Sequence, residues 1–144
     1  MDMPDFTAAD FRAIRESIGL TQADIANSCG VKLLAVKRWE RGENPIPEGV
    51  WDVLDEWSDR FEAAIATSVE TVTQQVAEMA GAPDVITLTY YRTQDDYDRY
   101  GRDEGPFGFV NAVAREAGAV IAESGFEVRF RYPTDGIVEG TTTP

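Results

Sequence analysis

Helix start and stop signals alternate at short intervals through the first 48 residues, and no other feature of the sequence constrains the fold as strongly. Two segments, 7–10 and 21–24, begin with threonine and place aspartate three residues later, which is the capping pattern of a helix start. Single glycines at positions 19, 30 and 42 mark three helix ends. Because the helix ends lie so close together, only short helices can form here. The second is predicted at 21–29 and the third at about 32–41. The sequence thus predicts a compact helical bundle that contains a helix-turn-helix.

The third predicted helix has two different sides when its residues are placed at about 100° per residue. One side is formed by Val36, Trp39 and Glu40, with Leu33 near its edge. The opposite side carries Leu34, Lys37, Arg38 and Arg41. An apolar side suits packing inside the bundle, whereas a side rich in Lys and Arg suits the phosphates and base edges of a DNA major groove. We therefore expect Trp39 to be a core residue and the basic side to face DNA.

Residues 20–42 resemble the λ-repressor-like (Xre-type) helix-turn-helix. That pattern reads L-T-Q-x-x-L-A, then G-V-S, then I-x-x-W-E-x-G, and the spacings here match it without a gap. The matching segments are Leu20-Thr21-Gln22-Ala23-Asp24-Ile25-Ala26, Gly30-Val31 and Val36-Lys37-Arg38-Trp39-Glu40-Arg41-Gly42. Lys32 stands where the pattern has Ser or Thr at the start of the recognition helix, which leaves the exact start of that helix open. Cys29 stands where relatives usually carry Leu, so it is expected to lie in the core.

The resemblance implies which side chains contact double-stranded DNA. Leu33, Leu34, Ala35 and Arg38 occupy positions that read bases in relatives, and Gln22 occupies a position that contacts the phosphate backbone. The candidate DNA-binding residues are Gln22, Lys32, Leu33, Leu34, Ala35, Lys37, Arg38 and Arg41. Two interpretations of the leucines stay open, since they can contact thymine methyl groups but make no bidentate hydrogen bonds. Leu33 is alternatively half-buried core, and Leu34 is alternatively exposed without a contact.

The charge of the chain is divided unevenly along its length. The formal net charge is −13, yet residues 11–42 contain six basic and three acidic residues. From residue 51 onward, seven arginines stand against eighteen acidic residues. At ordinary salt the Debye length is about 8 Å, so a distant acidic lobe is largely screened from a basic surface. The overall acidity therefore does not exclude DNA binding.

Composition argues against an enzyme, a cofactor and a membrane protein. The chain has no His, which removes His-based acid–base catalysis and most zinc sites. The glycine-rich segment 101–108 lacks the Lys-Ser/Thr of a phosphate loop, and the aspartates at 95, 96 and 98 fit a solvated face better than a metal site. Cys29 is the single cysteine, no apolar run reaches the length of a membrane span, and the start lacks the regions of a signal peptide. We expect a cytoplasmic protein without metal or cofactor.

The rest of the chain alternates between helical and strand patterns. Residues 48–80 carry an apolar residue every three or four positions, which predicts one or two helices and a core or dimer stripe. These residues are Trp51, Leu54, Trp57, Phe61, Ile65, Val69, Val72, Val76 and Met79. Residues 85–91 and 126–132 predict strands. Between them we expect a short helix capped by Thr93 and an amphipathic helix over 109–123 through Val110, Val113, Ala117 and Val120.

These patterns predict a mainly α fold with a small α+β part: a λ-repressor-like bundle with a helix-turn-helix, a long connecting helix and a C-terminal α/β module with two strands. The expected domains are residues 1–58, 59–132 and a flexible tail, 133–144. Because two strands make a marginal core, a second copy of the chain is expected to complete it.

The chain combines this helix-turn-helix and a long helix with the segment Leu88-Thr89-Tyr90-Tyr91-Arg92-Thr93-Gln94-Asp95-Asp96-Tyr97. This combination is similar to small two-domain regulators of the YdiL and anti-CRISPR-associated type, which implies a C-terminal module that dimerises and a protein that represses a promoter, often its own. We expect a homodimeric, sequence-specific repressor that acts on an inverted-repeat operator. The alternative is an antitoxin-like module, in which the acidic half binds a partner protein and the helix-turn-helix regulates its own operon.

Overall fold

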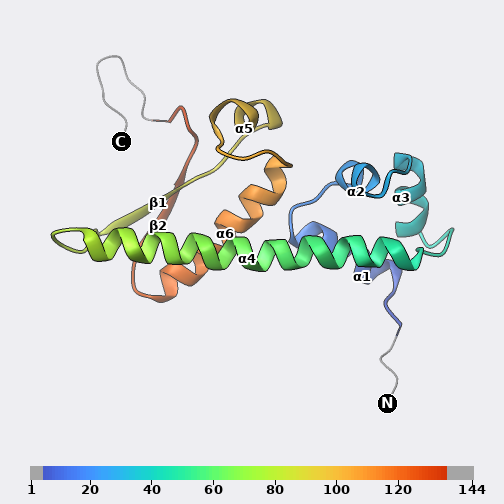
Figure 1. Ribbon diagram of the computed structural model, residues 1–144, viewed down its shortest axis with the longest axis horizontal. Coiled ribbons are helices and arrows are strands. Elements are labelled where there is room, and N and C mark those ends of the chain that lie inside the picture. The colour runs from blue at the N-terminus through green and yellow to red at the C-terminus, as the bar shows by residue number, and fades with distance from the viewer. Residues whose placement is uncertain (1–4, 136–144) are drawn as a thin grey trace. The chain divides into compact units, whose positions relative to one another are not determined.

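The structure is a computed structural model that describes residues 5–135, and it confirms a mainly helical fold with a small two-stranded sheet (Figure 1). In chain order the described elements are α1 (Ala8–Ser17), α2 (Gln22–Cys29), α3 (Leu33–Glu40), α4 (Glu48–Glu78), β1 (Val85–Thr89), α5 (Gln94–Tyr100), α6 (Phe107–Glu123) and β2 (Glu127–Arg131). The predicted flexible tail lies outside the described residues except for residues 133–135, which form a turn.

The chain divides into two compact units within α4. The first unit ends at Ala63 and the second begins at Ala64. Of the two possibilities for residues 48–80, one helix or two, the structure has one continuous helix of 31 residues. The predicted domain boundary after residue 58 stays a prediction.

The predicted helix starts of the first unit are present as complete capping boxes. The Thr7 hydroxyl accepts from the Asp10 amide at 3.1 Å, while the Thr7 amide donates to the Asp10 carboxylate at 2.8 Å. Thr21 and Asp24 repeat both bonds at 3.0 and 2.8 Å. Each capping box therefore gives a hydrogen-bond partner to the backbone N–H of the N-cap and of the third helix residue, using two side chains only three positions apart.

The turn between α2 and α3 depends on glycine. Gly30 follows α2 with φ at 66°, in the left-handed region that residues with a β-carbon rarely adopt. The open question of where α3 begins is answered by Lys32, which is its N-cap and forms no side-chain cap bond. Leu33 is thus the first residue of α3.

The core of the first unit gathers apolar side chains from all four helices. It consists of Phe11, Ile18, Leu20, Ile25, Ala26, Val36, Trp39, Val50 and Leu54. Trp39 is 6% exposed, which confirms it as a core residue. The expectation that Cys29 is buried is wrong, because this last residue of α2 is only half-covered. Even this partial burial raises the pKa of the Cys29 thiol and keeps it protonated at neutral pH.

In the second unit, β1 and β2 pair in parallel, with Val85 opposite Glu127 and Thr89 opposite Arg131. Parallel neighbours need a long crossover, which α5 and α6 supply (Figure 1). Helix α6 packs on the strands through Gly118, whose added β-carbon would stand 3.1 Å from Phe130 and 3.2 Å from Val128.

The predicted apolar stripe of α6 is wrong at one position. Val113 and Ala117 are buried as expected, but Ile121 continues the stripe and Val120 is 42% exposed. The reason is geometric, because the side of α6 that carries Gly118 is the side that meets the strands, and Ile121 lies one turn further along that side.

A buried asparagine closes the end of the sheet. The Asn111 amide donates to the Tyr91 carbonyl at 2.8 Å and accepts from the Tyr91 backbone amide at 2.9 Å. Asn111 is only 5% exposed. Its buried side chain forms the two hydrogen bonds with the Tyr91 backbone that the backbone of a further strand residue would otherwise form. Tyr97 packs against Tyr91 at 4.9 Å between ring centroids, and its burial raises the pKa of the Tyr97 phenol.

Because α6 lies very close to the strands at Gly118, a valine at this position should affect stability differently from a valine at the adjacent position. Gly118→Val should lower the free energy of unfolding by about 1–3 kcal/mol, because its side chain overpacks the contact with Phe130 and Val128, although valine is a better helix former than glycine. Ala119→Val, at an exposed position, should cost about 0.5 kcal/mol. Thermal denaturation of both variants checks this, and equal losses would contradict it.

Candidate nucleic-acid interface

Helix α3 has the two sides that its sequence predicts. Val36 is fully buried and Trp39 nearly so, whereas the opposite side is open to solvent. We call that opposite side the exposed face of α3, and it consists of Leu34, Lys37 and Arg38 together with Arg41, the C-cap residue of the helix. Leu34 is 47% exposed, Leu33 is 40% exposed, and Ala35 is half-buried. The start of the helix therefore presents two large apolar side chains next to cations.

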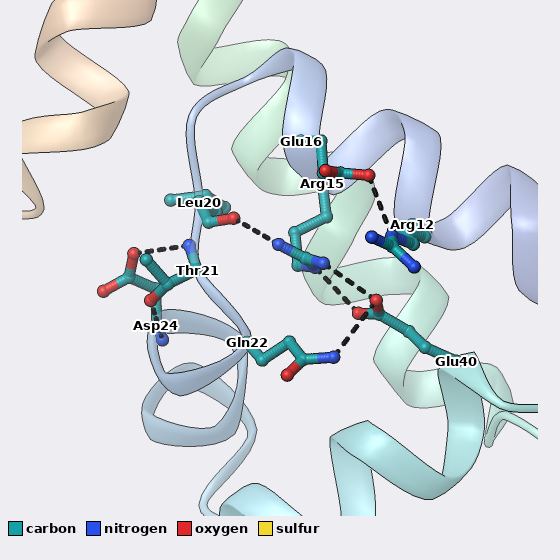
Figure 2. Close-up of polar contacts among 8 residues, drawn as sticks. All are labelled: Arg12, Arg15, Glu16, Leu20, Thr21, Gln22, Asp24 and Glu40. Carbon is teal, nitrogen blue, oxygen red and sulfur yellow. Dashed lines mark hydrogen bonds and ion pairs between the residues drawn. The ribbon is translucent and has the colours of Figure 1, made fainter.

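A buried ion pair holds α3 against α1, as Figure 2 shows. Arg15 Nε donates to Glu40 Oε2 at 2.7 Å, and its Nη2 donates to Glu40 Oε1 at 2.8 Å. The third donor, Nη1, binds the Leu20 carbonyl at 2.9 Å, in the link between α1 and α2. The two side chains are only 10% and 4% exposed. This bidentate pair joins both ends of the helix-turn-helix to the first helix.

Gln22 belongs to the same network. It is the first residue of α2, it is half-buried, and its side-chain amide donates to Glu40 Oε1 at 3.3 Å (Figure 2). The structure thus brings Gln22, a predicted phosphate-contacting residue, into contact with the buried carboxylate at the end of α3.

Sequence reasoning missed the Arg15–Glu40 pair. A signal was available, since Arg15 falls four residues after Phe11 on the inner side of α1, and Glu40 falls on the inner side of α3. Two opposite charges that both face a core are expected to pair, because an isolated buried charge is very costly.

The three acidic residues within residues 11–42 all have partners inside the first unit. Glu16 pairs with Arg12 at 2.9 Å, Asp24 caps α2, and Glu40 is neutralised by Arg15. Arg41 pairs with Glu43 at 3.3 Å, with both side chains about half exposed. An exposed pair of this kind contributes at most about 1 kcal/mol, so Arg41 can exchange it for a phosphate. The exposed face of α3 therefore carries positive charge without a carboxylate of its own helix beside it.

Metal and membrane sites find no support in the described part of the chain. Over residues 5–135, no group of three or more His, Cys, Asp or Glu side chains is arranged to hold a metal ion. Within the same range, none of the helices combines the length and apolar character that a membrane crossing requires.

A helix-turn-helix with a buried inner side and a basic outer side defines the first unit as a DNA-binding domain of a transcriptional regulator. Residues 6–107 match the Aca2/YdiL-like family model, and the chain belongs to this family of anti-CRISPR-associated helix-turn-helix regulators. The match includes the helix-turn-helix, α4, β1 and α5, and it ends at the first residue of α6. A search of curated proteins finds no match. The family therefore supplies the class of helix-turn-helix DNA-binding regulators.

Two of the acidic residues that pair with arginine in the first unit are expected to differ strongly in what their loss costs. Glu40→Ala should lower the free energy of unfolding by about 3–5 kcal/mol, because it leaves the buried Arg15 guanidinium without its carboxylate. Glu16→Ala, which breaks an exposed pair, should cost less than about 1 kcal/mol. Urea denaturation measures both values.

A double variant separates the effect of charge pairing from that of side-chain volume. Arg15→Met combined with Glu40→Leu should recover most of the stability that Glu40→Ala loses, because it removes both charges together. If Glu40→Ala and Glu16→Ala cost the same, the pair does not hold α3 in place.

Proposed function

We propose that the protein is a homodimeric, sequence-specific DNA-binding regulator that represses transcription by binding an inverted-repeat operator. The observation that carries this proposal is the exposed face of α3, where three cations surround an apolar residue on a helix whose other side is buried. In a helix-turn-helix the N-terminal residues of the second helix reach the base edges, and neighbouring cations hold the phosphates.

The proposed DNA contacts divide into two kinds. The proposed base contacts are Leu33, Leu34, Ala35 and Arg38, because they belong to α3 and occupy positions that read bases in the λ-repressor-like pattern. The proposed phosphate contacts are Gln22, Lys32, Lys37 and Arg41. Gln22 supports this division because its side-chain amide is held at the start of α2 by the contact with Glu40 at the end of α3.

Dimerisation is proposed for the second unit, on the ground that it leaves apolar surface uncovered. Among its described residues, Met79, Val85, Val120 and Phe130 are 40–52% exposed. An open groove of about 150 Å³ lies between α4 and the end of α6, lined by residues that include Val72, Val76, Ile121 and Phe126. Both strands of the two-stranded sheet are also edge strands, which are prone to pair or pack with another chain. A second copy would cover this surface and give the two-fold symmetry of a palindromic operator.

Selection of bound duplexes from random DNA tests the whole proposal. The expected product is an inverted repeat whose half-site centres are about 34 Å apart, or a multiple of that distance. Failure to enrich any duplex sequence would contradict sequence-specific binding.

The cations of α3 are expected to control the salt dependence of operator binding. Lys37→Ala and Arg41→Ala should each lower the slope of log K against log salt by about one for each phosphate that the side chain neutralises, because each such phosphate releases condensed counterions. Arg60→Ala is the matched control, since Arg60 lies on α4 and stacks on the Trp57 ring at 4.9 Å. Titrations at several salt concentrations measure the slopes. An equal change in all three variants would indicate a net-charge effect instead of contact by α3.

Neighbouring positions on α6 test the dimer interface. Val120→Lys should shift the full-length protein toward monomer, because it puts a charge on an apolar surface that the partner covers. Ala119→Lys is the control: it is also exposed, and both new lysines lie three or four residues from Glu116 and Glu123. Sedimentation at micromolar concentration compares the two. Monomer formation by neither variant, or by both, would remove Val120 from the interface.

A further inference from the structure

We infer that Leu33 and Leu34 read the 5-methyl groups of thymine, so that the operator half-site carries T·A base pairs opposite the start of α3. This inference rests on the proposed function, because it requires α3 to lie in a DNA major groove. It adds the chemistry by which the groove is read.

The position of the two leucines supports direct contact with base edges. They are the first two residues of α3, and the first turn of a recognition helix is the part that reaches deepest into the groove. Leu34 lies at the middle of the exposed face of α3, with Lys37, Arg38 and Arg41 around it at helical spacing. Leu33 lies near the edge of the opposite side of α3, next to Leu34 in the chain, and it is exposed to a similar degree.

The chemistry of the groove leaves one partner for an apolar side chain at that place. Base edges in the major groove present hydrogen-bond donors and acceptors, and the thymine methyl is the apolar group among them. Leucine has no donor or acceptor in its side chain, so it recognises a base by covering this methyl. Ala35, the third residue of α3, adds no bulk that would hold the helix away from the bases.

The cations around Leu33 and Leu34 indicate that the partner of these leucines is a nucleic acid and not an apolar protein surface. Lys32, Lys37 and Arg38 are exposed, and the backbone N–H groups of the first turn of α3 have no side-chain cap. An apolar partner protein would leave these cations desolvated and unpaired, whereas a duplex pairs them with phosphates on both sides of the groove. An apolar centre with cations around it is thus complementary to a thymine-containing major groove.

The test combines substitutions of the leucines in the protein with substitutions of thymine in the operator DNA. The selected operator is synthesised with uracil in place of each thymine in turn, which removes only the methyl group. The wild-type protein should bind about fourfold more weakly for each thymine that a leucine covers, since burial of one methyl-sized group is worth about 0.8 kcal/mol and 1.4 kcal/mol is tenfold. Leu34→Ala should bind thymine and uracil operators equally at the base pair that Leu34 covers, and Leu33→Ala at its own. Both leucines are exposed, and circular dichroism verifies that the variants fold.

Lys37→Ala is the matched control. It should weaken binding to both operators and keep the full difference between thymine and uracil, because it removes charge and no methyl contact.

The outcomes separate the inference from the function on which it rests. If the protein binds a specific operator but no uracil substitution weakens it, methyl reading is overturned and the regulator proposal stands. If the penalty persists in the variant that lacks both leucines, the methyl groups act through DNA shape and the inference is overturned as well. If no duplex is enriched at all, the proposed function fails and the inference fails with it.

Discussion

The arrangement of the first unit depends on the bidentate pair between Arg15 and Glu40 (Figure 2). Both charges are almost fully covered, so each is tolerated only because the other is present. The same guanidinium also binds the Leu20 carbonyl, and the same carboxylate receives the Gln22 amide. One interaction therefore positions α1, the start of α2 and the end of α3. It also keeps the negative charge of Glu40 inside the unit and off the basic side of α3.

The second unit needs other stabilising contacts, because a two-stranded parallel sheet has little core of its own. Helix α6 approaches the strands closely where Gly118 has no side chain, and Asn111 satisfies the backbone at the end of β1. These contacts cover one face of the sheet. They leave apolar side chains such as Val120 and Phe130 at the surface, which is the physical basis for proposing a second copy of the chain there.

Exposed apolar residues thus occur in two settings with different chemistry. Around Leu33 and Leu34 the neighbours are cations, and the complementary partner is a polyanion that offers a methyl group. The second unit has both exposed apolar residues and an apolar groove between α4 and α6, and the complementary partner is another apolar surface. The neighbours of an exposed leucine or valine, and not its exposure alone, indicate what it binds.

The sequence by itself determined the starts of α1 and α2, the glycine that ends α2, and the two sides of α3. Capping boxes, glycine stops and helical periodicity act within a few residues, so they can be read without the fold. Only the tertiary structure decided the Arg15–Glu40 pair, the parallel register of β1 and β2, the partial exposure of Cys29, and the choice of Ile121 over Val120. Each of these depends on segments far apart in the chain or on which side of a helix meets its neighbour, and local spacing does not contain that information.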